Sequence, residues 1–332
     1  IVAGRSNLAE SEGVASASIN AVLAACPGAK VLPVLRRGNV FGAVRMGLTP
    51  QDGGLDGLGI LQAAAGGKLE CLVLLGVDPI GDCPDGDLAR QALAGARRLI
   101  AVDTHLTDSS KLAQVVLAVS AYGEKAGTTT NIEGRVQTVA QKVTATGTTR
   151  PDWMIAAELM SRFGVDEAIE HLETVDDVTE EIAASVPGFA GVTIGALRAT
   201  ADGLVAGTTG SATELPLRTT STAESRISYD YRLVVSRKLY DQAVGTSRSP
   251  SLAALAPGSA AHVHPLDLDR IGVKSGTEIR VVGARSTVVL PVVPNEAVAR
   301  GTVWVPFNQP GSNIADAIDA QAGVADVRLE RL

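Results

Sequence analysis

The stretch EKAGTTTNIEGRVQ, residues 124–137, holds the side chains of this chain whose types and spacing best suit chemistry. Asn131, Glu133 and Arg135 alternate along it, and Gly134 lies between the two opposite charges. A carboxylate close to a guanidinium could bind a substrate or move a proton. No nucleophile, acid–base pair or metal ligand accompanies them, so we interpret the loop as structural. Gly134 can take the positive φ of a tight turn, and Arg135 has a fixed fork of donors suited to bridging segments.

Two further carboxylates each follow an apolar run. Asp78 comes after the run 69–75, and Asp103 comes after the run 99–102. If these runs are parallel strands, both side chains lie at carboxyl ends, where such sheets bind ligands, and each could hold a ribose hydroxyl or a purine edge. Each could equally cap the turn that follows it. The sequence leaves both readings open, and it has no GxGxxG or Walker loop that would indicate a Rossmann dinucleotide site or a P-loop.

Other catalytic and metal sites are disfavoured. A triad of Asp103, His105 and Ser109 lacks a GxSxG turn to present the serine, and neighbours in sequence rarely face one another correctly. The histidines do not fall at ligand spacing with cysteines or carboxylates, which disfavours a structural zinc or iron site. Three cysteines, odd in number and widely spaced, suit ordinary thiols in a reducing compartment. They are Cys26, Cys71 and Cys83.

Composition narrows the class of protein. The chain has 332 residues, 45% of them hydrophobic, so it can bury a core and form two or three domains. Its net charge of -7 provides no basic stripe for phosphates, which disfavours nucleic acid as a partner. The apolar runs are far shorter than the roughly 20 residues that a membrane-spanning helix needs, so we expect no direct membrane insertion. The start at Ile1, without a methionine or a signal-peptide pattern, leads us to expect a fragment.

The first 150 residues alternate between predicted helices and strands. A helix at 10–25 stops at Pro27 and is followed by the apolar run 31–35, which predicts one β-α-β unit. Near-continuous apolar strands then alternate with helices, which is typical of a parallel sheet covered on both faces. The expected strands are 69–75, 99–102 and 115–119, and the expected helices are 60–65 and 87–96, with a helical turn at 110–114. We therefore predict a doubly wound α/β domain over residues 1–150.

The rest of the chain changes character twice. Residues 151–198 form a predicted helical extension, in which a helix from Asp152 carries an apolar face that includes Trp153, Ile155 and Phe163. An acidic stretch from Glu167 to Glu181, which includes Glu170, is read as a solvated helical face or a docking surface. Residues 199–226, rich in Thr, Ser, Ala and Gly, predict a flexible linker or loop. Residues 227–332 contain short β-forming runs, including a hairpin around Gly283, and predict a compact barrel.

Several motifs resemble one protein family. Residues 122–128, YGEKAGT, followed by NIEGRVQ with Asn131, Glu133, Gly134, Arg135 and Gln137, resemble the signature of the G subunit of bacterial NADH-quinone oxidoreductase, respiratory complex I, in the molybdopterin oxidoreductase superfamily. Weaker matching pieces are GNVFGA at 38–43, LGVDP at 75–79, PDW at 151–153, RFG at 162–164 and LDRIGVKSG at 268–276. The last piece resembles a double-psi-type dinucleotide-binding barrel.

The resemblance carries implications for cofactors. It implies that iron–sulfur clusters belong to an amino-terminal part that would precede Ile1, and that complex I members keep this fold without the molybdenum cofactor. Asp78, Asp103, Asn131 and Asn313 match, loosely, positions where active relatives contact the pterin nucleotide. In this chain they would be vestigial, so the resemblance implies no catalytic residue, no metal ligand and no bound cofactor in this segment.

The resemblance implies a non-catalytic scaffold region in the peripheral arm of a proton-pumping NADH:quinone oxidoreductase. The holoenzyme transfers electrons from NADH to quinone, and this region would contact other peripheral-arm subunits at the cytoplasmic side of the bacterial inner membrane. The alternative is the carboxyl-terminal part of a molybdenum-dependent, formate-dehydrogenase-like oxidoreductase, with molybdopterin held between the α/β domain and the barrel. A third reading is a plain nucleotide-binding module.

Overall fold

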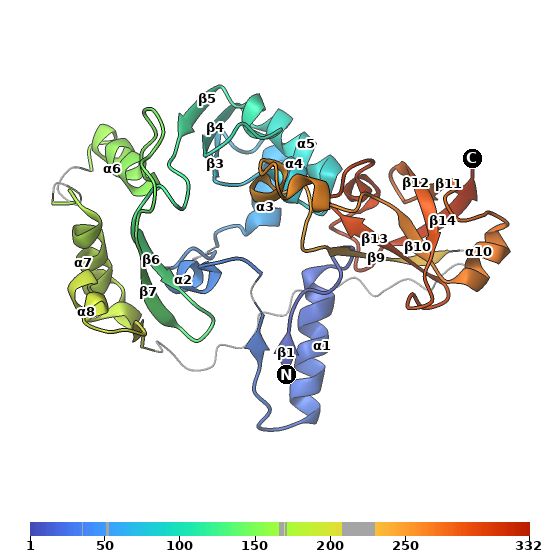
Figure 1. Ribbon diagram of the computed structural model, residues 1–332, viewed down its shortest axis with the longest axis horizontal. Coiled ribbons are helices and arrows are strands. Elements are labelled where there is room, and N and C mark those ends of the chain that lie inside the picture. The colour runs from blue at the N-terminus through green and yellow to red at the C-terminus, as the bar shows by residue number, and fades with distance from the viewer. Residues whose placement is uncertain (35, 51–52, 166–168, 170, 208–229) are drawn as a thin grey trace.

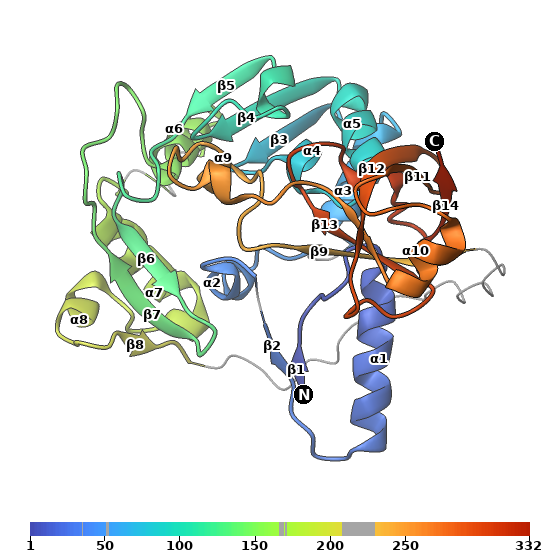
Figure 2. The same ribbon diagram turned by 45° about the vertical axis from the view of Figure 1, so that its right-hand side comes forward.

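The computed structural model describes residues 1–34, 36–50, 53–165, 169, 171–207 and 230–332 (Figures 1 and 2). Glu167 and Glu170 of the acidic stretch, and residues 208–226 of the predicted linker, lie outside the described residues. The described part contains a three-stranded parallel sheet, a closed six-stranded barrel and two further sheets. The predicted fold class, an α/β domain followed by a β-rich barrel, is confirmed. None of the helices in the described ranges is long and apolar enough to span a membrane.

The parallel sheet has the strand order β3-β4-β5. Its elements follow the predicted alternation and are α3 (Gly57–Ala65), β3 (Cys71–Leu75), α4 (Pro79–Asp82), α5 (Gly86–Gly95), β4 (Arg98–Asp103), η1 (Ser110–Leu112) and β5 (Val115–Ala118). Helices α3 and α5 cover one face, where Leu72, Leu74 and Leu99 pack against small helical residues such as Ala64. A Cβ on Gly95 would lie 2.3 Å from the Ala64 carbonyl oxygen, so the close approach of α5 to α3 requires glycine there.

The opposite face of this sheet is covered only in part. Near the carboxyl ends of β4 and β5, Ile155 of α6 (Asp152–Arg162) packs against Val102 of this face. Beside β3 the same face is open, because Val73 and Leu75 are 52% and 60% exposed. Helices therefore lie on both faces, as predicted, but one strand stays uncovered on one side. The predicted apolar face of α6 is also buried only in part, since Phe163 is 82% exposed.

The predicted β-α-β unit at the start of the chain forms a sheet of its own. Strands β1 (Val2–Ala3) and β2 (Leu32–Pro33) are parallel, and α1 (Glu12–Ala25) connects them. The unit extends away from the rest of the molecule (Figure 2). Its attachment lies after β1, where the backbone N–H of Leu8 donates to the carbonyl oxygen of Val235 at 2.7 Å.

A third group of elements surrounds the 124–137 stretch. Strands β6 (Gly127–Thr130), β7 (Arg135–Val139) and β8 (Leu204–Val205) form an antiparallel sheet. It is accompanied by α2 (Val40–Arg45), α7 (Val175–Ser185), η2 (Pro187–Phe189) and α8 (Ile194–Arg198). The core of this group contains Val136, Phe189 and Ile194. Strand β8 lies inside the stretch predicted as a linker, so part of that stretch is ordered into the sheet.

The last third of the chain is a closed barrel with the strand order β10-β12-β11-β14-β9-β13. The barrel strands are β9 (Tyr231–Arg237), β10 (Ala261–Val263), β11 (Glu278–Val282), β12 (Thr287–Pro294), β13 (Thr302–Phe307) and β14 (Asp326–Arg331). Their connections carry α9 (Val244–Ser247), η3 (Ala253–Leu255), α10 (Pro265–Ile271) and η4 (Ile314–Ala317). Strands β11 and β12 form the predicted hairpin around Gly283. Leu8 joins Leu233 and Val235 in the barrel core, so a segment near the start of the chain completes this domain.

Candidate functional site

The NIEGRVQ stretch is a turn held by its own asparagine. The side-chain oxygen of Asn131 accepts the backbone N–H groups of Glu133 and Arg135, both at 2.9 Å. Gly134 has a φ of +80°, as the tight bend required. The amide of Asn131 is therefore used to close the connection between β6 and β7.

Arg45 of α2 provides the bridge over this turn. Its Nη1 donates to the carbonyl oxygens of Ala206 and Gly207 at 3.0 and 3.1 Å, and its guanidinium lies 4.5 Å from the centre of the Phe41 ring. A Cβ on Gly134 would lie 3.1 Å from Arg45 Nη1, so the glycine also leaves room for this guanidinium. The GNVFGA region and the NIEGRVQ turn, matched separately in the sequence, thus pack against each other.

Arg135 itself makes only long contacts. Its Nε lies 3.5 Å from the Glu133 carboxylate, and its Nη1 lies 3.5 Å from the carbonyl oxygen of Asp202. The expected bridge from Arg135 to another segment is therefore weak. Gln137 is exposed on β7, and Glu133 is 66% exposed, so neither lies in an enclosed site.

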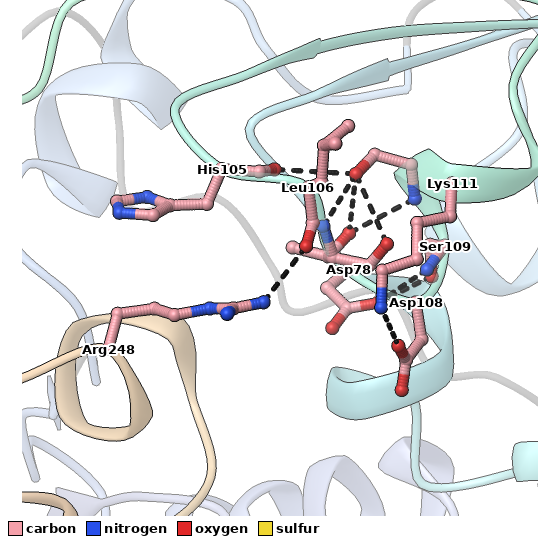
Figure 3. A network of polar contacts seen from close by, with 9 residues as sticks. Asp78, His105, Leu106, Asp108, Ser109, Lys111 and Arg248 are labelled. Atoms are coloured by element: carbon pink, nitrogen blue, oxygen red, sulfur yellow. Dashed lines mark hydrogen bonds and ion pairs between the residues drawn. The ribbon is translucent and has the colours of Figure 1, made fainter.

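Asp78, at the carboxyl end of β3, is paired with a buried serine (Figure 3). The Ser109 hydroxyl donates to the Asp78 carboxylate at 2.5 Å and accepts the backbone N–H of Ile80 at 2.9 Å. Ser109 is fully buried. Of the two readings that the sequence left open for Asp78, the geometry favours the structural one, in which it fixes the loop after β3.

Asp103 and His105 lie at the end of β4 but do not join Ser109 in a triad. Asp103 accepts the backbone N–H of Thr104 at 2.7 Å, and the exposed ring of His105 contacts the Thr104 hydroxyl at 3.0 Å. Since the Ser109 hydroxyl is committed to Asp78, the disfavoured triad is not assembled. In the same region, Arg248 reaches from the barrel side to the carbonyl oxygen of Leu106 at 3.0 Å (Figure 3).

A cleft of about 890 Å³ opens beside β3 and helix α3, between the segments that follow β1 and β2 and the barrel. Its charged lining residues are Arg5, Arg36, Arg37 and Arg237, with Glu12, Asp78 and Asp82. Arg5 follows β1, Arg36 follows β2 and Asp78 follows β3, while Arg237 ends β9 of the barrel. Ligands of open α/β sheets bind at such carboxyl ends, so this cleft is the candidate ligand site.

Most of the guanidinium groups in the cleft are paired. Asp82 accepts from Arg37 at 2.8 Å and from Arg237 at 2.7 Å, and Arg5 lies 3.1 Å from Glu12. Within the described ranges, Arg36 has no ion pair. Its pKa is lowered from the ordinary value by partial burial and by the neighbouring charges of Arg237 and Arg37. An unpaired cation between other cations favours an anionic ligand such as a phosphate.

The remaining predicted pocket residues lie elsewhere. Asp103 and Asn131 do not line the cleft, and Asn313 caps η4, where its side-chain oxygen accepts the Ala315 N–H at 3.1 Å. The described residues contain no cluster of three or more His, Cys, Asp or Glu side chains suited to a metal ion. Sequence reasoning missed the arginines of the cleft. The signal available was an arginine shortly after each of three short apolar runs, IVAGR, VLPVLRR and RLVVSR.

Two family models match different parts of the chain. Residues 4–162 match the family described as Molybdopterin oxidoreductase, and residues 234–327 match the Molydopterin dinucleotide binding domain. The first match contains the cleft arginines that follow β1 and β2, and the second contains Arg237.

Curated relatives are similar along most of this chain. The NADPH-Fe(3+) oxidoreductase subunit alpha of Geobacter sulfurreducens is 28% identical over 91% of the chain and 37% of its own length. The F420-dependent formate dehydrogenase 2 subunit alpha of Methanococcus maripaludis is 27% identical, over 85% of the chain and 48% of the relative. The G subunit of NADH-quinone oxidoreductase from Streptomyces coelicolor is 29% identical, over 82% of the chain and 29% of the relative. The chain thus spans less than half the length of each of these relatives.

A solved structure shares the fold. Acetylene hydratase from Pelobacter acetylenicus superposes with a TM-score of 0.60 at 16% identity, covering 82% of this chain and 46% of that one. The order of the α/β sheet and the barrel, and the two family matches, agree with this likeness. Residues 4–162 and 234–327 of the chain thus match domain models of molybdopterin oxidoreductases.

Proposed function

We propose that the chain is a structural, non-catalytic region of a proton-pumping NADH:quinone oxidoreductase, and that it belongs to the G subunit of that complex. It would work in the peripheral arm at the cytoplasmic side of the bacterial inner membrane and contact other peripheral-arm subunits. The supporting observation is that the polar side chains at the expected ligand positions serve the chain's own backbone. Asp78 fixes its loop through Ser109, and Asn131 closes the β6–β7 turn. These hydrogen bonds give both side chains a role in holding the fold, which supports the structural assignment.

A second candidate is supported by the cleft. Its volume of about 890 Å³ lies within the common range for ligand pockets, and Arg36, which makes no ion pair among the described residues, offers a cation there. The residues therefore fit a phosphate of a pterin dinucleotide, which Arg36 would hold. When bound in an oxidoreductase, such a cofactor supplies the metal centre at which the substrate is oxidised. The chain would then be the carboxyl-terminal part of a molybdenum-dependent, formate-dehydrogenase-like enzyme.

Substitution of Arg36 in the whole purified enzyme separates the two candidates. For a structural region, Arg36→Ala should leave NADH:quinone activity per assembled complex unchanged, and elemental analysis should find no stoichiometric molybdenum. Arg300→Ala is a matched control, because Arg300 is exposed and does not line the cleft. Molybdenum and pterin that are present in the parent, and that fall together with formate oxidation in Arg36→Ala, would replace the first candidate by the second.

A further inference from the structure

A second pocket, of about 410 Å³, opens on the barrel. It lies between the β9–β10 connection and strands β10, β12 and β13. Among the described residues, it shares no lining residue with the candidate cleft. Arg237, the last residue of β9, lines the cleft, whereas Lys238 directly after it lines the pocket. Successive side chains at the end of a strand point to opposite sides, so the pocket is a separate site.

The pocket contains a lysine whose charge has no acidic partner. Lys238 makes no ion pair within the described ranges, and its Nζ lies 4.5 Å from the centre of the Trp304 ring. The indole is itself fixed, because its Nε1–H donates to the Ser236 hydroxyl at 2.8 Å. An aromatic face attracts an ammonium group without neutralising its charge. Lys238 thus offers a positioned cation to a ligand in the pocket.

The rest of the lining is uncharged at neutral pH. The ring of His262 lines the pocket, and its centre lies 4.5 Å from that of Trp304. Burial and the charge of Lys238 lower the pKa of His262 from 6.5, so the imidazole is neutral at pH 7 and can still form a hydrogen bond. Apolar side chains form much of the remaining wall, and they are Leu239, Leu255, Pro257, Val293 and Pro306.

We propose that this pocket binds a small organic monocarboxylate with an apolar body. Lys238 would bind the carboxylate, and the apolar wall would cover the hydrocarbon. One compact ammonium group suits a single negative charge, whereas a phosphate is commonly held by the forked donors of arginine. Burial against apolar side chains favours a hydrocarbon over a sugar, whose hydroxyls would lose hydrogen bonds to water. The site lies outside the cleft, so it does not depend on which function the chain serves.

The pocket is connected to the α/β domain through one loop. The β9–β10 connection contributes Leu255 and Pro257 to the wall. The same connection carries Arg248, whose Nη2 donates to the carbonyl oxygen of Leu106 at 3.0 Å (Figure 3). A ligand that binds only the folded pocket stabilises the protein by mass action. Occupancy should therefore raise the melting temperature and brace the loop that reaches the α/β domain.

Phenylacetate is the probe, and phenylacetamide is its uncharged analogue. Isothermal titration calorimetry on the whole protein should show a single phenylacetate site, and saturation should raise the melting temperature. Phenylacetamide and inorganic phosphate should bind at least about tenfold more weakly, because neither forms the charge-assisted contact together with the apolar one. Lys238→Met should weaken phenylacetate binding by a similar factor, since it removes the charge and keeps an apolar stem. Lys274→Met, at an exposed lysine outside the pocket, is the matched control and should bind like the parent.

The fluorescence of Trp304 gives a second readout at the site itself. The chain has two tryptophans, so Trp153→Phe leaves Trp304 alone to report. Phenylacetate should change its emission with the Kd that calorimetry gives. Absence of phenylacetate binding would overturn the proposal, as would equal binding of phenylacetamide or phosphate, or a Lys238→Met protein that binds like the parent. Binding that leaves the Trp304 emission unchanged would place the ligand elsewhere and overturn it as well.

Discussion

The guanidinium of Arg285, in the β11–β12 hairpin of the barrel, donates to the carboxylate of Asp85 at the start of α5, at 2.6 Å. Asp85 is 1% exposed and also accepts the backbone N–H groups of Leu88 at 2.9 Å and Ala320 at 3.0 Å. Burial acts to lower the pKa of Arg285, but the hydrogen bond and charge of Asp85 raise it above its ordinary value. The Asp85 carboxylate thus caps helix α5, which covers the parallel sheet, and also binds the barrel through Arg285.

Removal of this pair should weaken the junction between sheet and barrel. Arg285→Ala leaves a buried carboxylate without its cation, and we expect a loss of about 2 kcal/mol in the free energy of unfolding. The loss is smaller than for a fully buried pair, because the Arg285 side chain is 35% exposed. Urea denaturation of the variant measures it. Arg97→Ala is the control, since its pair with Glu70 is largely exposed. Equal losses in the two variants would contradict the prediction.

Ser109 should matter for stability rather than for chemistry. Ser109→Ala removes a donor to Asp78 and an acceptor for Ile80 N in a fully buried place. We expect a loss of roughly 1–3 kcal/mol on thermal or urea unfolding. The exposed Ser185→Ala, which removes a hydroxyl bonded to a helix carbonyl, should cost much less. A Ser109→Ala protein with the stability of the parent but without activity would mean that the serine is chemical.

The glycine of the NIEGRVQ turn should resist substitution. Gly134→Ala places a side chain at a φ of +80°, which costs about 1–2 kcal/mol, and brings its Cβ against Arg45. Differential scanning calorimetry should show a lower melting temperature. Gly127→Ala provides the matched control, because Gly127 has ordinary φ and open space where the Cβ would lie. If the two variants melt alike, the turn is less constrained than the structure indicates.

His262 should make the protein sensitive to mild acid. Burial beside Trp304, whose ring centre lies 4.5 Å away, and the nearby charge of Lys238 lower the pKa of His262 from its ordinary value of 6.5. The folded protein then binds this proton less tightly than the unfolded chain. The free energy of unfolding should therefore fall as the pH drops below 6.5 and should be unaffected above it.

Removing this titration tests the assignment. His262→Gln should flatten the dependence of the unfolding free energy on pH below neutrality, measured by urea titrations at a series of pH values. His105→Gln, at an exposed position on the other domain, is the control and should keep the slope of the parent. An unchanged slope in the His262 variant would assign the acid sensitivity to other groups.

Elements whose signal is local were predictable from the sequence. The apolar runs became β3, β4 and β5, and the two runs around Gly283 became a hairpin, because strand formation follows side-chain pattern and turn type. The role of Asp78 was not predictable, since it depends on Ser109, which lies 31 residues later in the chain. The same holds for Arg45, whose carbonyl partner Ala206 is 161 residues away.

The candidate cleft shows more clearly which features could not be predicted from the sequence. Its arginines lie after strands from two different domains, and each looks like an ordinary charge that ends a strand. Arg36 differs because the positive charges of Arg37 and Arg237 lie near it. The folding of the barrel against the rest of the chain brings these residues to the same cleft. The net charge of the chain also gave no sign of these arginines, because a chain that is acidic as a whole can still concentrate cations in one cleft.

The junction between Asn7 and β9 has a consequence for how the chain folds. The Asn7 side-chain oxygen accepts the backbone N–H of Val235, across 228 residues of sequence, and Leu8 enters the barrel core beside it. A ribosome at about 5–20 residues per second delivers these partners many seconds apart. During that interval the early segment has no barrel to enter, and contacts of such high separation also slow folding in solution. We therefore expect the barrel to form late, with the parallel sheet already present as its support.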